Sequence, residues 1–326
     1  MQRSTLVFVA RRLFHLIPVV FAIAAMNFLL IKLAPGDAAD ILAGQMGHAS
    51  LEFTEQLRRS FGLDLPLFEQ FLVYMGRLAS LDLGHSFIQG VPVLELILDR
   101  LPATLILMVA AIVLALGGGV VLGVSAARRQ GTWLDNAISV SALVVYATPA
   151  FWLGLMLIVL FSIVLDLLPS GGMMRIGAGK TGIAHILDVA RHLILPAATL
   201  GLFYVAIYTR LMRAAMLEVY GLEFITTARA KGLSEDAIAW THAFRNALLP
   251  IVTLAGVQVG HLLGGSVLVE TVFGWPGLGR LVFDALLQRD LNLLLGILFI
   301  SSIVVVFANL IVDLLYGLLD PRIVHK

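Results

Sequence analysis

The chain has 326 residues, of which 60% are apolar and 13% are charged, about half the charged fraction of an average soluble domain. This composition excludes an ordinary water-soluble core and indicates a chain that is largely embedded in lipid. The net charge of +1 gives no reason to expect nucleic acid as a partner, and the lack of cysteine excludes a disulfide framework, a Cys-ligated metal and a thiol nucleophile.

Several stretches without Asp, Glu, Lys or Arg are long enough, or nearly so, to cross a bilayer, which takes about 20 apolar residues. There are six of them: Leu13–Ile31, Leu101–Ala127, Asn136–Leu165, His192–Thr209, Asn246–Val269 and Leu291–Val312. The first is longer than the apolar core of a secretory signal peptide, so we expect a retained helix. The third is too long for one span. The fourth is short and contains Pro196, a kink that a packed bundle tolerates.

The predicted fold is therefore an all-α polytopic membrane protein with six transmembrane helices. We expect an N-terminal segment with the first span over 1–33, a helical insert over 34–100, a core membrane domain over 101–320 and a tail over 321–326. The predicted parts of the core domain are spans at about 101–126, 137–162 and 192–212, a long loop at 213–247, a span at about 248–270, a loop at 271–290 and a last span at about 291–315.

The placement of Lys and Arg predicts which side of the membrane each connection occupies. One set of connections, formed by 1–12, 128–135, 210–245 and 313–326, holds twelve basic residues. The other set, formed by 34–100, 166–191 and 270–290, holds nine over a greater length. By the positive-inside rule, both termini and the long loop are cytoplasmic, and the insert over 34–100 is external.

The insert has a helical pattern. Apolar residues recur at helical spacing behind Ser50, a good N-cap, and Pro66 suits the start of a second helix. Val93–Arg100 is amphipathic and leads into the second span. Such an insert could cap the mouth of the bundle, and a solvated loop with two short helices fits the pattern equally well.

The stretch RIGAGKTG, Arg175–Gly182, has some features of a phosphate-binding loop. That loop requires Gly, four residues and then Gly-Lys-Ser/Thr, between a strand and a helix. Met174 occupies the first glycine position, and the preceding Leu167–Gly172 is a turn-forming cluster. Lys180 also falls in an external connection, where ATP is not kept. We therefore expect a glycine-rich external loop here.

The stretch Glu218–Thr253 is predicted to form two helices that meet at a glycine. Glu223–Lys231 favours a helix, and Gly232 stands where a C-cap glycine belongs. Ser234 then caps a second helix that continues into the fifth span. A rigid, exposed helical elbow indicates a docking site, although an ordinary solvated connection fits these residues equally well.

This stretch resembles the ATPase-docking loop of ABC importer permeases, whose general motif is Glu-Ala-Ala, three residues, Gly, nine residues, Ile-x-Leu-Pro. The matching positions are Thr226-Thr227-Ala228, Gly232 and Leu249-Pro250, with Thr in place of Glu and five extra residues between the glycine and the proline. The peptide/nickel subfamily shares this spacing, and THAFRNALLPIVT is similar to it. Further similar segments cover nearly the whole chain: Ala34–Asp37, Leu81–Ser86, Glu270–Arg280, Asn309–Tyr316 and Asp320–Arg322.

The insert resembles that of the first, B-type, permease of dipeptide and oligopeptide importers. The resemblance implies a type I importer permease fold and a subunit of an ATP-driven, binding-protein-dependent importer in a bacterial inner membrane. Di- or oligopeptides are the implied cargo, with a nickel chelate, glutathione or a short oligosaccharide as alternatives. The implied partners are a second homologous permease, two ATP-binding subunits that hold ATP and Mg²⁺, an external substrate-binding protein and the lipid bilayer. This chain is expected to carry no catalytic residue and no cofactor of its own.

The resemblance also implies site residues. Those expected to couple to the ATPase are Glu223, Thr226, Thr227, Ala228, Arg229, Ala230, Lys231, Gly232, His242, Arg245, Asn246 and Pro250. Those expected to border an external gate or the dock for the binding protein are Glu270, Phe273, Trp275, Pro276, Gly277 and Gly279. The two aromatic residues of the second set also fit an anchor at the lipid interface.

Polar residues within the spans are candidates for the transport pathway. Gln258 and His261 share one face of the fifth span, where a hydrogen bond to a neighbouring helix is the alternative role. Asn309 and Asp313 share a face of the sixth span, and Asp313 is a candidate partner of a basic residue such as Arg210 or Arg213, as a gate or a brace.

Other classes of protein are less well supported by the sequence. The histidines on the external side or its border, His48, His85, His185 and His192, lack the i, i+4 spacing of metal ligands, so no metal site is expected. A secondary transporter needs ionisable groups along its midplane, for which His261 is the credible candidate. An intramembrane enzyme needs a nucleophile–base pair or a metal motif, and the spans contain neither.

Overall fold

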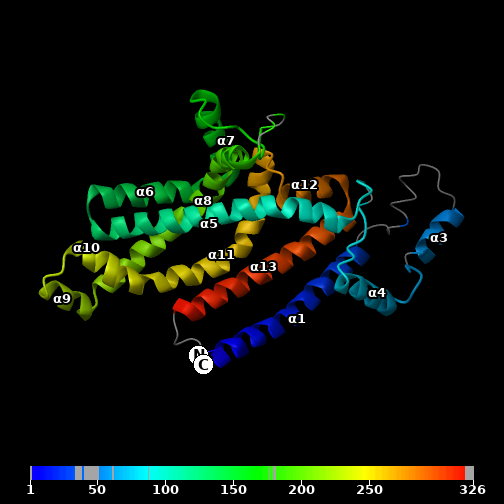
Figure 1. Ribbon diagram of the computed structural model, residues 1–326, viewed down its shortest axis with the longest axis horizontal. Helices are drawn as coiled ribbons and strands as arrows, with labels where there is room; N and C mark the ends of the chain where they lie inside the picture. The colour runs from blue at the N-terminus through cyan, green and yellow to red at the C-terminus, as the bar shows by residue number, and fades with distance from the viewer. Residues whose placement is uncertain are drawn as a thin grey trace. The chain divides into compact units, whose positions relative to one another are not determined.

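The computed structural model describes residues 2–33, 39, 51–60, 62–86, 88–175, 177, 179 and 181–319, except the side chains of 2–13, 15–16, 51, 57, 60, 259 and 313–319. The regular elements of this part are helices (Figure 1). In chain order they are α1 (Gln2–Leu33), α3 (Leu51–Ser60), α4 (Leu67–Ala79), α5 (Val93–Arg128), α6 (Trp133–Ala147), α7 (Ala150–Ile158), the π-helical η1 (Val159–Val164), α8 (Gly182–Tyr220), α9 (Glu223–Ala230), α10 (Glu235–Ala237), the π-helical η2 (Ile238–Ala243), α11 (Phe244–Phe273), α12 (Leu278–Gln288) and α13 (Leu291–Leu319).

Among the described helices, three are uninterrupted and long and apolar enough to cross a membrane: α5, α8 and the Leu291–Val312 part of α13. Two bent pairs, Trp133–Ala147 with Ala150–Val164 and Glu235–Gln258 with Gly260–Phe273, raise the number to five if each pair is one span. Ile17–Leu33 is a shorter apolar helix. The six apolar runs of the sequence thus all coincide with helical residues, but not with six uninterrupted spans.

The predicted third span over about 137–162 is not one helix. α6 ends before Thr148, which has an extended backbone (φ −83°, ψ 127°), and α7 begins after Pro149. The two arms of this pair are bent by 106°. The cause is Pro149, because a proline disfavours helical geometry in the residue before it and lacks the N–H that a continuing helix would use.

The chain divides into two compact units: unit 1 (Met1–Asp99, Val282–Leu310 and Pro321–Lys326) and unit 2 (Arg100–Leu281 and Ile311–Asp320). In unit 1, the edge of the Phe28 ring on α1 packs on Phe71 of α4, with ring centroids 5.3 Å apart. Asn27 donates a hydrogen bond to the carbonyl of Leu295 on α13 (3.3 Å). The predicted helices of the insert are present as α3 and α4.

Unit 2 is built around α8, which packs against α6, α7 and α11. Small residues bring α5 very close to α8. A Cβ at Gly119 would lie 2.5 Å from the Cβ of Tyr208, and a Cβ at Gly123 would lie 2.6 Å from the Cβ of Met212. Such close approach gives van der Waals contact along the whole crossing, which is what holds helices together in lipid.

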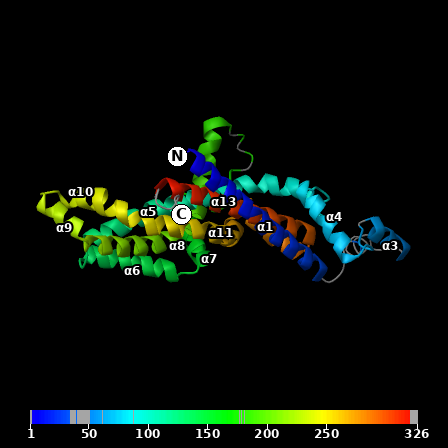
Figure 2. The same ribbon diagram turned by 90° about the horizontal axis from the view of Figure 1, so that it is seen from below.

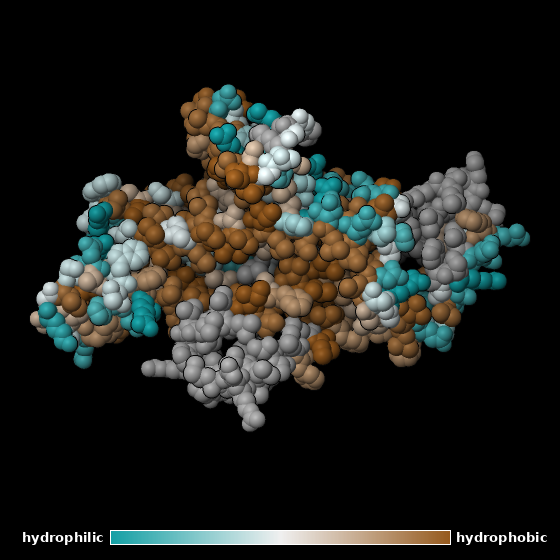
Figure 3. Space-filling view, in the orientation of Figure 1, coloured by the Kyte–Doolittle hydropathy of each residue, from teal (hydrophilic) through white to brown (hydrophobic). Residues whose placement is uncertain are grey.

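The surface of unit 2 differs between its middle and one end. Figure 3 shows apolar residues covering α5 and α6, whereas polar residues gather around α9 and α10. Figures 1 and 2 agree that α9 and α10 lie beyond the turn between α5 and α6, at the end of unit 2 that α8 reaches with Tyr220. This distribution is that of a helix bundle whose middle faces lipid and whose end faces water.

Candidate functional site

The first candidate site is the elbow, defined here as residues 223–243, which comprises α9, the turn after it, α10 and η2. The turn is a Schellman motif: the N–H of Gly232 donates to the carbonyl of Arg229 (2.9 Å) and that of Leu233 to the carbonyl of Ala228 (3.3 Å). Gly232 has a left-handed backbone (φ 77°), which a side chain with a Cβ would strain. The predicted glycine break is therefore confirmed.

The second arm of the elbow begins with the predicted cap. The hydroxyl of Ser234 accepts a hydrogen bond from the N–H of Ala237 (3.3 Å). The arm then differs from a simple α-helix, because η2 is a π-helical turn before α11 starts at Phe244. A wider turn of this kind redirects the side chains that follow it.

Two ion pairs hold the elbow. The guanidinium of Arg229 donates to both carboxylate oxygens of Glu235, from Nε (2.8 Å) and Nη2 (3.3 Å), and so joins the two arms across the glycine turn. This hydrogen bonding keeps the pKa of the Glu235 carboxyl below its ordinary value. Arg128, the last residue of α5, pairs with Asp236 on α10. The elbow is therefore a braced joint rather than a loose connection.

The elbow is buried on one side and exposed on the other. Ile225, Ile238, Ala239 and Ala243 are buried, so α9 is packed against η2, and η2 is packed against α8. The exposed large apolar side chains nearby are Leu222, Phe224, Leu233 and Trp240. Exposed apolar side chains gathered on a polar, braced segment are typical of a protein–protein contact surface.

The sequence-predicted coupling residues all lie in the elbow or in the first two turns of α11. Glu223, Thr226, Thr227, Ala230 and Lys231 are exposed on α9 and its cap. The side-chain amide of Asn246 donates to the carbonyl of His242 (2.7 Å), and Arg245 and Pro250 are exposed on the same stretch.

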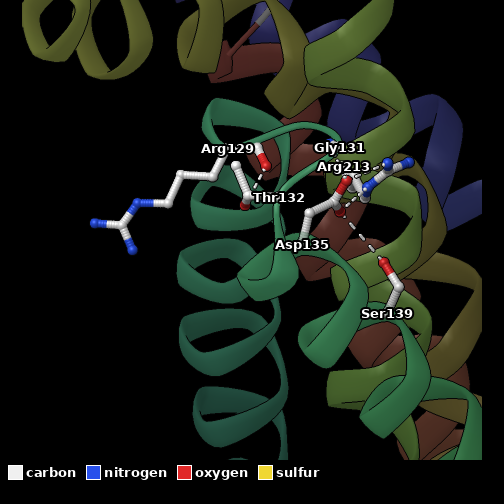
Figure 4. Close-up of polar contacts among 6 residues, drawn as sticks. All are labelled: Arg129, Gly131, Thr132, Asp135, Ser139 and Arg213. Carbon is white, nitrogen blue, oxygen red and sulfur yellow. Dashed lines mark hydrogen bonds and ion pairs between the residues drawn. The ribbon is translucent and has the colours of Figure 1, made fainter.

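An ion pair behind the elbow was not predicted from the sequence. Asp135, in the first turn of α6, accepts hydrogen bonds from Nε (2.6 Å) and Nη2 (2.8 Å) of Arg213 on α8 (Figure 4). The N–H of Gly131 (3.0 Å) and the hydroxyl of Ser139 (3.4 Å) also donate to this carboxylate. We call this arrangement the clamp.

The clamp and the elbow are joined through the connection between α5 and α6. Arg128 at one end of this connection pairs with Asp236 of the elbow, and Asp135 at its other end pairs with Arg213 of α8. The sequence signal was a single acid directly before the charge-free run that begins at Asn136. Arg213 is engaged by Asp135. The side chain of Asp313 lies outside the described part, so its pairing with a basic residue stays a prediction.

The second candidate site surrounds Glu270, whose side chain is buried at the end of α11. Its carboxylate accepts hydrogen bonds from the hydroxyl of Thr104 on α5 (2.7 Å) and from the N–H of Arg280 in the first turn of α12 (3.0 Å). The N-terminus of a helix favours a negative charge at this position. A Cβ at Gly277 would lie 2.4 Å from the carboxylate, so only glycine leaves room for it.

The aromatic residues of this segment are part of the core. The exposed fraction is 2% for Phe273 and 0% for Trp275, whose indole N–H donates to the carbonyl of Ala103 (2.9 Å). The alternative of an anchor at the lipid interface is therefore wrong for both residues. Pro276 is half-buried and Gly279 is buried, so this predicted gate or dock segment is a packed cluster that joins α5, α11 and α12.

Among Gln258, His261 and Asn309, the pathway candidates whose side chains the structure describes, no hydrogen bond or ion pair joins one to another. On α11, Gln258 is half-buried and His261 is exposed, whereas Asn309 on α13 is exposed. Arg210, the other candidate partner of Asp313, lies over the ring of Tyr146 at 5.9 Å. Among the described residues, no group of three or more His, Cys, Asp and Glu side chains could hold a metal ion, and His48 lies outside them.

Comparisons with known proteins agree along nearly the whole chain. The model of the family described as "Binding-protein-dependent transport system inner membrane component" matches residues 119–325, and the model of its N-terminal part matches residues 5–108. The Di/tripeptide transport system permease protein DppB of Pseudomonas aeruginosa is 41% identical over 333 residues, covering 98% of this chain and 99% of the relative. The Dipeptide transport system permease protein DppB of Escherichia coli strain K12 is 41% identical over 338 residues, with the same shares covered.

A solved structure shows the same fold. A chain of the MetNI methionine ABC transporter, in an inward-facing conformation, has a TM-score of 0.55 and 18% identity to this chain. The likeness covers 71% of this chain and 95% of that one. It supports the all-helical importer-permease fold.

Proposed function

This chain belongs to the family of inner-membrane components of binding-protein-dependent transport systems, and we propose that it moves di- or oligopeptides into the cell. In this proposal it is a permease subunit without an ATPase site of its own. It acts with a second homologous permease, two ATP-binding subunits and an external substrate-binding protein. ATP and Mg²⁺ are held by the ATP-binding subunits.

The observation that carries this proposal is the braced elbow. A motor that closes on ATP can move a bundle only through a contact that does not deform. The Schellman turn at Gly232 and the Arg229–Glu235 pair give the elbow that rigidity. The exposed apolar side chains of the elbow, among them Phe224 and Trp240, provide a surface for the ATP-binding subunit.

The clamp would transmit this motion to the spans. A push on the elbow acts on α5 through Arg128–Asp236 and on α8 through η2, against which α9 is packed. The pair Asp135–Arg213 then makes α6 move with α8. Closure of the ATP-binding pair would thereby shift the population of the permease between inward-open and outward-open arrangements.

Orientation is part of the proposal, and the lack of cysteine makes it testable. A Lys231→Cys variant should react with a membrane-impermeant maleimide in inverted vesicles and not in intact cells. Arg59→Cys, on α3 of the insert, is the matched control and should show the opposite pattern. Labelling of Lys231→Cys from outside intact cells would contradict the proposed orientation and the ATPase contact with it.

The function itself is tested by purification and by transport. The tagged chain should co-purify with separate ATP-binding chains, and cells that express the complete importer should take up radiolabelled alanyl-alanine only while ATP is available. Uptake that follows a proton or sodium gradient without ATP would instead support a secondary transporter. If the substrate-binding protein binds a nickel chelate, glutathione or an oligosaccharide but no peptide, the proposed peptide cargo is wrong. The proposed ATP-driven mechanism would still stand.

A further inference from the structure

A polar cavity lies in unit 2, far from the elbow. Its volume is about 720 Å³, and it is lined by the segment 166–175 and by the start of α8. Its charged or titratable lining residues are Asp166, Arg175, Asp188, Arg191 and His192. The volume falls within the range of about 300–1,000 Å³ that is usual for small-molecule sites.

The wall of the cavity is a built structure. The carboxylate of Asp188, of which 7% is exposed, accepts a hydrogen bond from the N–H of Arg175 (2.8 Å) and so fixes the loop to α8. His192, of which 8% is exposed, places its Nδ1 2.8 Å from the carbonyl of Asp188, an arrangement that orients its ring. Two polar side chains that are more than nine-tenths buried therefore form the floor.

Three residues before Arg175, the loop is also fixed to α11. The N–H of Gly172 donates to the carbonyl of Phe273 (2.7 Å), and a Cβ at Gly171 would lie 2.5 Å from that same oxygen. The packed cluster around Trp275 thus supports the loop that lines the cavity. Because the loop is held at Gly172 and at Arg175, the backbone that carries Arg175 is preorganised for a ligand.

Three charged side chains of the lining are exposed: Asp166, Arg175 and Arg191. In the part of the chain that the structure describes, none of the three has an ion-pair partner. The cavity therefore presents two guanidinium groups and one carboxylate that can pair with a ligand carrying charges of the opposite sign. Guanidinium groups bind carboxylates in a bidentate manner, and an aspartate binds an ammonium group.

The cavity lies at the other end of the unit from the elbow. About 30 residues of α8 separate His192 from the start of α9, or about 45 Å at 1.5 Å per residue. This length exceeds the roughly 30 Å of the hydrocarbon core. In the proposed orientation, the cavity opens on the side from which the cargo arrives.

We propose that this cavity binds a short zwitterionic peptide, with the peptide carboxylate on Arg175 and Arg191 and the peptide ammonium on Asp166. The proposal rests on the proposed function and adds to it a cargo site in the permease itself. An extended di- or tripeptide is about 7–10 Å long, which such a cavity accommodates. A neutral oligosaccharide offers no charge to these three groups, so the site favours peptides among the cargo candidates.

Photolabelling tests the site directly. The complete importer, in lipid nanodiscs and without its receptor, is irradiated with the dipeptide L-alanyl-p-benzoyl-L-phenylalanine, and the adducts are mapped by mass spectrometry. We expect adducts within residues 166–192 and competition by unlabelled alanyl-alanine. Arg191→Gln should lower the adduct yield about fivefold, as befits a partly exposed charge pair. The matched control Arg59→Gln, on α3, should leave the yield unchanged.

A second probe isolates the contact of Asp166. Acetylation of the probe's amino group should reduce labelling of the wild type about fivefold and should not change labelling of Asp166→Asn. Asn is the chosen replacement because it tolerates the left-handed backbone at this position (φ 48°). Equal losses in both proteins, adducts outside 166–192, or labelling only when the receptor is present would overturn the cavity proposal. All variants should keep the thermal stability of the wild type, and Arg175→Gln replaces Arg191→Gln if the latter fails this check.

Uptake separates the two proposals. If cells with the complete importer accumulate alanyl-alanine in an ATP-dependent manner while labelling misses the cavity, the cargo site is wrong and the transport function stands. If the wild type accumulates no peptide, the peptide-import proposal is wrong, and the cargo site that rests on it is overturned as well.

Discussion

Asp135 on α6 and Arg213 on α8 form a two-pronged ion pair, at 2.6 and 2.8 Å, in which 3% of the aspartate side chain and 30% of the arginine side chain are exposed. The two residues are 78 positions apart in the chain. Their contact ties together two helices that lie on either side of the 106° break and the glycine-rich loop. It is a bidentate, largely buried polar link behind the elbow.

Removal of the charge from Asp135 should weaken the bundle. Asp135→Asn leaves the guanidinium of Arg213 without its partner, and we expect a loss of about 2 kcal/mol in the free energy of unfolding. This is below the cost of breaking a wholly buried pair, because Arg213 is partly exposed. Chemical denaturation of the purified chain in detergent measures the loss. Asp236→Asn is the control, since that carboxylate is 72% exposed. Equal loss in the two variants would contradict the role of the clamp.

The turn at Gly232 should be sensitive to the shape of the side chain rather than to its bulk alone. Gly232→Val places a β-branched residue at φ 77°, which costs about 1–2 kcal/mol, although nothing lies within 4 Å of its Cβ. We expect ATP hydrolysis to continue while peptide uptake is lost. Gly232→Asn should retain most uptake, because Asn adopts left-handed geometry.

A second glycine controls for backbone strain in general. Gly90 has φ 69° and equally open surroundings, but it lies in unit 1. Gly90→Val should leave the ratio of transported peptide to hydrolysed ATP unchanged. A normal ratio in Gly232→Val would show that the elbow tolerates deformation, and the coupling model would then be abandoned.

The elbow should lose order in acid. Arg229 holds the pKa of Glu235 below its ordinary value of 4.5, chiefly by donating hydrogen bonds to the carboxylate. Because the folded pKa is the lower one, this contact stabilises the elbow fully above pH 4.5 and is lost as the pH falls through the lowered value. The hydrogen-exchange protection factors of the Gly232 and Leu233 amides, which are corrected for the intrinsic pH dependence of exchange, should therefore fall below that pH. In Glu235→Gln this pH dependence should be absent, and its persistence would point to another group.

A methyl group at Gly277 should destabilise the packed cluster around Glu270. Gly277→Ala places a Cβ 2.4 Å from the buried carboxylate, and we expect a loss of about 1–3 kcal/mol in the free energy of unfolding. Gly264→Ala on α11 is the matched control, because its Cβ would meet nothing within 4 Å. A thermal melt of the two variants compares them, and equal melting temperatures would show that α12 can move away from Glu270 at little cost.

The sequence by itself determined the features that depend on neighbouring residues. Apolar runs without charge locate the membrane helices, and Gly232 with Ser234 locates the elbow, because capping acts within one helical turn. The turn-forming residues Leu167–Gly172 likewise marked the end of a helix. Motifs spread over the whole chain were sufficient to identify the family.

Only the tertiary structure decided which distant residues meet. Asp135 pairs with Arg213, and Trp275 is wholly buried, although each stood in a segment whose sequence fitted other roles. The cavity is likewise lined by a loop that α8 holds at Arg175 and α11 holds at Gly172. The physical reason is that burial and charge pairing depend on how helices pack, whereas periodicity and capping are written in a few consecutive residues.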